Sequence, residues 1–101
     1  MIVLSGKDSK TIGNTMEETK ERHLRYLRAT NSPVRRDILR ALKDKPLTVD
    51  ELLNQIKLDE KTLNWHLSIL EWGYCIEKES RNDVLYYNLT QEGKIVDYVD
   101  K

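Results

Sequence analysis

The sequence predicts an α+β, mostly helical domain, in which a series of short helices is followed by a two-stranded β-hairpin. Apolar residues recur at helical spacing as far as Trp72, and after Gly73 the period changes to the alternation that is typical of strands. Residues that start helices precede three of the helical segments, at Ser32, Thr48 and Asp59. A chain of 101 residues is long enough for one such core.

Composition and charge narrow the classes of function. The formal net charge is zero, but residues 1–45 carry eleven Lys/Arg and six Asp/Glu, whereas residues 46–101 carry six and eleven. The basic half can supply phosphate contacts, and the acidic half tempers that expectation. No apolar run approaches the roughly 20 residues of a membrane span, so we expect a cytoplasmic protein without a membrane partner. We expect residues 1–15 to form a flexible tail and residues 16–101 to form the domain.

The first two helices are expected over residues 16–29 and 33–43. Ser32 can cap the second of them, because it is followed by a proline at the first helical position. The apolar side of the first helix comprises Met16, His23, Leu24 and Leu27.

The third and fourth helices are expected to cross steeply, because only a tight turn separates them. A capping box in which Thr48 and Glu51 each satisfy the other's backbone amide starts the third, and Asp59 caps the fourth. We expect the fourth helix to end where Gly73 adopts a left-handed conformation. Its spacing predicts two apolar sides that are both buried: Leu63, His66, Leu67 and Leu70 on one, and Trp65, Ile69 and Trp72 on the other.

The alternating segments after Gly73 predict a hairpin and a last helix. Strands are expected over residues 75–79 and 84–89, with residues 80–83 as the loop between them. The pleat would turn Leu85, Tyr87 and Leu89 toward the core. Thr90 would cap a final helix over residues 91–99.

This order of elements is that of a winged helix-turn-helix domain. Four runs, Ser32 to Leu39, Leu47 to Leu52, Thr62 to Leu70 and Tyr86 to Thr90, resemble the ArsR-type transcriptional regulators, and the resemblance covers about residues 16–100. It implies that the fourth helix enters the major groove of DNA, that the hairpin wing touches the backbone or minor groove, and that the terminal helices build a two-fold homodimer.

The resemblance also assigns candidate DNA-binding residues. On the fourth helix the groove-facing positions are Lys61, Thr62, Asn64, Trp65 and Ser68. Asn64 is the best base reader among them, because its amide can pair bidentately with adenine. Trp65 departs from the usual polar residue of the family. Its indole can contact a thymine methyl, or it can instead pack against the first helix or a neighbouring subunit.

Five further cations are candidates for phosphate contacts. The resemblance brings the start of the second helix near the DNA backbone, and the other cations lie in the turn before the fourth helix and around the wing tip. For each of them the alternative is a solvated surface position. They are Arg35, Arg36, Lys57, Lys78 and Arg81.

No metal, cofactor or catalytic group is expected. Many ArsR-type proteins sense metals through cysteines at the third helix, but residues 47–52 contain none here. The soft ligands His23, His66 and Cys75 are scattered over separate elements, without the close-spaced pair that a zinc site prefers. No serine, histidine and acid are placed on a strained turn, so we expect a non-enzyme. Cys75 is expected to be a small buried residue, with a redox switch as the alternative.

The sequence therefore predicts a homodimeric transcriptional regulator that binds double-stranded DNA. The alternative is a winged-helix protein interaction module without DNA affinity, which would use Trp65 and Tyr86 to hold a protein partner. A third possibility is a sensor on the same scaffold, although no residue identifies a small-molecule effector.

Overall fold

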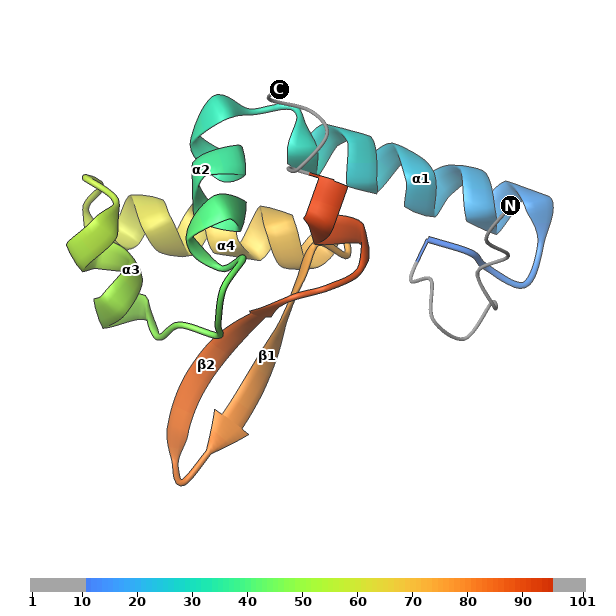
Figure 1. Ribbon diagram of the computed structural model, residues 1–101. Coiled ribbons are helices and arrows are strands. Elements are labelled where there is room, and N and C mark those ends of the chain that lie inside the picture. The colour runs from blue at the N-terminus through green and yellow to red at the C-terminus, as the bar shows by residue number, and fades with distance from the viewer. Residues whose placement is uncertain (1–10, 96–101) are drawn as a thin grey trace.

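The computed structural model describes residues 11–95 and confirms the predicted fold class. Four helices pack around one core, and a two-stranded antiparallel hairpin projects away from them as the wing (Figure 1). The elements are α1 (Met16–Thr30), α2 (Pro33–Ala41), α3 (Val49–Gln55), α4 (Glu60–Trp72), β1 (Ile76–Arg81), β2 (Val84–Leu89) and the 3-10 helix η1 (Glu92–Ile95). Within the described residues no helix is long and apolar enough to cross a membrane.

The predicted helix starts are confirmed by their hydrogen bonds. Ser32 and Asp59 each accept a bond from the backbone amide three residues later. Thr48 and Glu51 form the complete capping box. Because each cap is built from residues close in sequence, these boundaries are determined locally. The end of α2 has no such side-chain cap, and it lies at Ala41 instead of the predicted residue 43.

Gly73 ends α4 for a different reason from the one predicted. Its φ is −89°, and the left-handed conformation falls on Tyr74, whose φ is 67°. A Cβ on Gly73 would lie 2.3 Å from the Ala29 side chain and 2.9 Å from the Arg25 carbonyl oxygen. The glycine is therefore needed for the close approach of α4 to α1, not for its backbone torsion.

The burial of α4 differs from the prediction, and on α1 the core covers other residues than the apolar side found in the sequence. On α1 the buried side chains are Tyr26, Ala29 and Thr30, while Leu24 and Leu27 are exposed. On α4 the side of Leu63, His66, Leu67 and Leu70 is buried as predicted. The opposite side is open, with Trp65 58% exposed and Trp72 41% exposed. A single copy of the chain therefore leaves apolar side chains uncovered on both helices.

The strands of the wing are joined by a two-residue turn instead of the predicted four-residue loop. Asn82 and Asp83 both have positive φ, 50° and 66°, so β1 extends to Arg81, which pairs with Val84. Leu85 is 44% exposed, contrary to the expectation that it faces the core. The hairpin extends beyond the helices, so only its base can cover the core.

The base of the wing is fixed to the helical part by backbone bonds. Leu47, just before α3, exchanges both backbone hydrogen bonds with Tyr87 of β2, at 2.8 and 3.2 Å. Tyr87 is buried, as predicted. The buried apolar side chains of the core are Tyr26, Ala29, Ile38, Leu39, Leu42, Leu47, Leu52, Leu63, Leu67, Leu70, Cys75, Ile76 and Tyr87.

Thr90 caps the C-terminal turn, as predicted. Its hydroxyl accepts a bond from the Gly93 amide at 3.2 Å and donates to the Tyr74 carbonyl at 2.6 Å. The predicted helix over residues 91–99 is described only to residue 95, where it is the short η1; its remainder lies outside the described residues. Of the predicted tail, residues 11–15 are described, and the Ile12 carbonyl accepts a bond from Arg22 of α1.

We predict that Gly73→Ala lowers the free energy of unfolding by about 1–3 kcal/mol, because the new methyl group would overpack the α1–α4 contact. Urea unfolding followed by circular dichroism measures this. The control is Gln55→Ala, at an exposed position of α3, which should change stability by less than about 0.5 kcal/mol. Equal effects of the two variants would contradict the close-approach explanation.

Candidate nucleic-acid interface

The open side of α4 gathers most of the predicted base-reading residues on one surface. Lys61, Asn64, Trp65 and Ser68 are all exposed, and at 100° per residue they fall on one stripe, opposite the buried Leu63, Leu67 and Leu70. Thr62 lies at the edge of this stripe and is half-buried. We refer to Lys61, Asn64, Trp65 and Ser68 together as the α4 open face.

Two hydroxyl groups at the α4 open face are already used within the helix. Thr62 donates from its hydroxyl to the carboxylate of the capping Asp59, and Ser68 donates to the Trp65 carbonyl at 2.7 Å. The Thr62 amide also donates to Asp59, and these two bonds hold the pKa of the Asp59 carboxyl below its usual value. Within residues 11–95 the side-chain amide of Asn64 makes no hydrogen bond, so both its donor and its acceptor remain available.

Trp65 stands on a buried histidine. Its indole meets the His66 ring edge to face, with ring centroids 4.8 Å apart. His66 points the other way, into the core, where its Nδ1 lies 3.3 Å from the Arg35 guanidinium. A guanidinium can only donate, so Nδ1 is the acceptor and the ring is the neutral tautomer protonated at Nε2. Burial, and then the Arg35 charge, lower the pKa of His66.

Arg35 and Arg36 are engaged at the end of α1. Arg35 donates to the Ala29 carbonyl at 2.8 Å and to the Arg28 carbonyl at 3.2 Å. Arg36 donates to the Thr30 carbonyl at 2.9 Å. The Ala29 and Thr30 carbonyls are among the last of the helix, which lack partners within it, and the two guanidiniums satisfy them; the Arg28 carbonyl also accepts from the Asn31 amide at 3.3 Å. Both arginines are half-buried, and burial lowers the pKa of Arg35. Their first structural role is therefore to fix α1 against α2.

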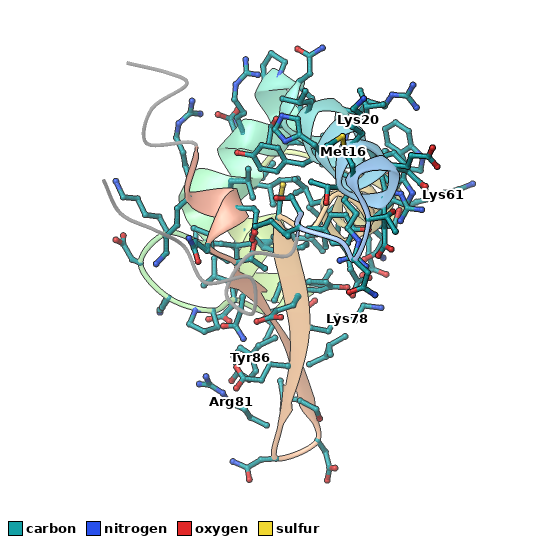
Figure 2. All side chains as sticks on the ribbon, turned by 90° about the vertical axis from the view of Figure 1, so that its right-hand side faces the viewer. Met16, Lys20, Lys61, Lys78, Arg81 and Tyr86 are labelled. Carbon is teal, nitrogen blue, oxygen red and sulfur yellow. The ribbon has the colours of Figure 1, made fainter. Side chains whose placement is uncertain are left out.

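The wing cations lie on two different sides of the domain. Figure 2 shows Lys61 and Lys78 projecting on the same side, whereas Arg81 and Tyr86 lie on the other side of the hairpin. Lys78 is 3.6 Å from the Glu71 carboxylate of α4, at a half-exposed position where the pair contributes little. Arg81 pairs with Glu79 at 2.8 Å and lies over the Tyr86 ring at 5.7 Å.

Lys57 is exposed in the turn before α4, which leaves it free to approach a phosphate. The structure thus brings together Lys61, Asn64, Trp65 and Ser68, with Lys78 on the same side. Arg81 lies on the other side of the hairpin. Arg35 and Arg36 are bound to carbonyls at the end of α1.

One feature of this surface was missed in the sequence. A groove between α3, α4 and the wing tip is lined by three carboxylates, Asp50, Glu60 and Asp83, together with Asn64 and Leu85. The carboxylates come from three separate parts of the chain, so no local sequence pattern predicts that they lie together. They repel phosphates, and a nucleic acid on the α4 open face must keep its backbone clear of this groove.

The remaining reactive groups lie outside this surface. Cys75 is fully buried, and burial raises the pKa of its thiol to about 12, so the folded chain keeps it as an unreactive thiol. Among the described residues no three metal-ligating side chains are grouped in a way that could hold a metal ion.

Comparison with known proteins identifies the fold. A family model described as a helix-turn-helix domain matches residues 30–71, which contain α2, α3 and all but the last residue of α4. HlyU from Vibrio cholerae N16961 is 23% identical with a TM-score of 0.70, over 83% of this chain and 94% of that one. A protein described as an ArsR family transcriptional regulator is 23% identical with a TM-score of 0.65, over 78% and 81%.

NolR from Sinorhizobium fredii is 25% identical with a TM-score of 0.69, over 98% of this chain and 93% of that one. No curated protein matches the chain significantly. The resemblance predicted from the sequence is confirmed: the helices and wing have the arrangement found in ArsR-type winged helix-turn-helix proteins.

We predict that the domain loses stability as the pH falls below about 6.5, because the unfolded chain then takes up a proton at His66 that the folded chain binds less readily. The loss continues until the pH passes the lowered pKa of the folded state. Urea unfolding at pH 7.5, 6.5 and 5.5 measures it, and His66→Gln should flatten the dependence over this range.

The matched control is His23→Gln, which replaces the other, exposed histidine and should keep the wild-type dependence. Carboxylates such as Asp59 add their own losses only at lower pH. An unchanged slope in His66→Gln would show that the buried imidazole does not couple folding to pH.

Proposed function

We propose that this chain, which has the winged helix-turn-helix fold of ArsR-type regulators, is a cytoplasmic transcription regulator that binds double-stranded DNA sequence-specifically as a homodimer. The α4 open face carries the proposal. It is a polar and aromatic helix surface, uncovered by the rest of the domain and flanked by a projecting hairpin. An α-helix of this kind fits the major groove, and the wing then reaches the neighbouring backbone.

The contacts divide into two kinds. Asn64 and Trp65 face the bases, with Thr62 and Ser68 beside them. Phosphates are contacted by the exposed cations Lys57, Lys61, Lys78 and Arg81. The phosphate contacts predicted for Arg35 and Arg36 stay predictions, since both side chains already hold the end of α1. No cofactor, metal or catalytic step is part of this proposal.

An uncovered apolar surface on α1 supports the homodimer. Met16, Leu24 and Leu27 are 77%, 54% and 46% exposed. Trp72 of α4 and Leu24 line one shallow groove between the two helices. Arg25 lies over the Trp72 ring at 5.4 Å, which keeps this side chain next to α1. Apolar side chains gathered in this way mark an association surface. A second copy of the chain with the same surface would cover it under two-fold symmetry.

A second candidate function rests on the exposed Trp65 and on the charges around it. The α4 open face has only one cation, and the groove beside it is lined with carboxylates. A winged-helix module that binds a protein through Trp65 and Tyr86 would account for both features. Such a module would show no affinity for duplex DNA above background.

We predict that the protein binds duplex DNA with a steep salt dependence. Four cations in each protomer give eight phosphate contacts in a dimer, so the slope of log K against log salt should be about −7. Fluorescence anisotropy of a labelled duplex selected from a random pool measures this slope. Lys78→Ala should reduce its magnitude by about 2, because two contacts are lost per dimer.

The control variant is Lys94→Ala, which removes an exposed cation from η1, on the opposite side of the domain from Lys61 (Figure 2). Its slope should equal that of the wild type. Absence of duplex binding even at low salt would refute the DNA-binding proposal and favour the protein module.

We also predict that Leu24→Glu converts the dimer to a monomer, because it places a charge in the apolar association surface of α1. Its position between Lys20 and Arg28, four residues away on each side, should preserve the helix. Sedimentation equilibrium gives the mass. Leu85→Glu, at an equally exposed apolar residue of the wing, should stay dimeric. A wild-type monomer at micromolar concentration would contradict the homodimer.

A further inference from the structure

We propose that Asn64 and Trp65 together read adjacent A·T pairs, with the Trp65 indole packed against the C5-methyl group of a thymine in each half-site. This inference rests on the proposed function and specifies what the α4 open face recognises. It follows from which chemical groups of that face are still available, from how the indole is held, and from the absence of arginine in α4.

The available groups are few. The hydroxyls of Thr62 and Ser68 have given their hydrogens to acceptors of α4 and its cap, so neither has a hydrogen left to donate to a base. Asn64 keeps both its amide donor and its carbonyl acceptor, and this pair matches adenine N6 and N7. Lys61 is exposed about one turn before Asn64, and its ammonium group is assigned to a phosphate contact in the proposed function. The hydroxyl oxygens of Thr62 and Ser68 can still accept a bond, but on the α4 open face Asn64 is the side chain that offers a base both a donor and an acceptor.

Trp65 offers an apolar surface and no hydrogen-bond acceptor. In the major groove the largest apolar group on a base edge is the thymine methyl group. The indole N–H can donate to guanine as well as to adenine or thymine, so it does not discriminate between the pairs, and a G·C pair offers the ring only C–H edges in place of a methyl group. Every A·T pair carries an adenine edge for an amide and a methyl group for an indole. The two neighbouring side chains thus favour the same kind of base pair.

The indole is held in place before any DNA arrives. His66 supports it from beneath at 4.8 Å, and Arg35 holds the His66 ring at 3.3 Å from inside the core. The Trp65 side chain is 58% exposed, so more than half of its surface is available to a ligand. An aromatic side chain supported in this way loses little conformational entropy on binding. Because the support also limits the movement of the indole, the ring cannot close the gap that is left when the thymine methyl group is removed.

Replacement of thymine by deoxyuridine tests the inference directly, since it removes the methyl group and keeps every hydrogen bond of the base pair. The selected duplex is synthesised with one symmetric pair of thymines replaced at a time, and the affinity of each is compared with the parent. For the wild type, one thymine position in each half-site should weaken binding about fourfold per methyl group lost.

Two variants make the comparison specific. Trp65→Ala should bind the thymine and deoxyuridine duplexes equally, because nothing remains to contact the methyl group. Trp65→Leu keeps an apolar contact and should keep part of the discrimination. The ratio of the two affinities is taken within one protein preparation, so it does not depend on how much of a variant is folded.

The outcomes separate this inference from the proposed function. A wild type that binds its selected duplex and tolerates deoxyuridine at every position would overturn the thymine contact while DNA binding stands. Discrimination that persists in Trp65→Ala would overturn the contact as well. If the protein selects no duplex at all, the proposed function fails, and the base-reading role of Trp65 fails with it.

Discussion

The guanidinium of Arg35 joins three helices at one point, and the orientation of α4 depends on it. From its place at the start of α2 it donates to two carbonyls at the end of α1 and to the Nδ1 atom of His66 in α4. His66 is buried and must stay neutral to accept that bond. His66 in turn supports the Trp65 indole, which it meets edge to face with 4.8 Å between the ring centroids. The chemistry of the exposed surface is thus determined by a polar contact in the interior.

The distribution of charges shows how a chain with no net charge could bind DNA, which is a polyanion. The carboxylates are not spread evenly: three of them line the groove between α3, α4 and the wing tip, while Lys61 and Lys78 project together on one side. In the proposed complex the duplex therefore lies on that side of α4 and meets Arg81 only at the tip of the wing. The phosphate contacts hold the duplex without reading its sequence, so sequence discrimination depends on the bases. The α4 open face has the groups for this in Asn64 and Trp65.

The caps and the order of elements could be predicted from the sequence, because each cap joins residues within one turn of each other. The role of Gly73 could not be predicted, because it depends on its contact with Ala29, which is 44 positions earlier in the sequence. Periodicity found an apolar side on α1 and could not say whether the core or a second copy covers it. The core took Tyr26 and Ala29 instead.

The candidate site divides in the same way. The resemblance assigned Lys61, Asn64, Trp65 and Ser68 to the groove-facing side of the fourth helix, and the structure places all four on one exposed stripe. The sequence could not show that Arg35 turns inward or that carboxylates from three elements gather beside Asn64, because both depend on tertiary packing. The expected burial of Trp65 failed for a related reason: an aromatic residue at helical spacing is covered only if another element lies above it, and in one copy of the chain none of the described elements does.

The α4 open face is proposed as the surface that meets DNA, and the two tryptophans of the chain make this measurable. Each has one indole N–H resonance in a ¹H–¹⁵N spectrum, and Trp65→Phe and Trp72→Phe variants assign them. Addition of the selected duplex should shift or broaden the Trp65 indole signal far more than that of Trp72, which lies beside α1. A Trp65 signal that stays unchanged while the duplex is bound would mean that DNA meets another face of the domain.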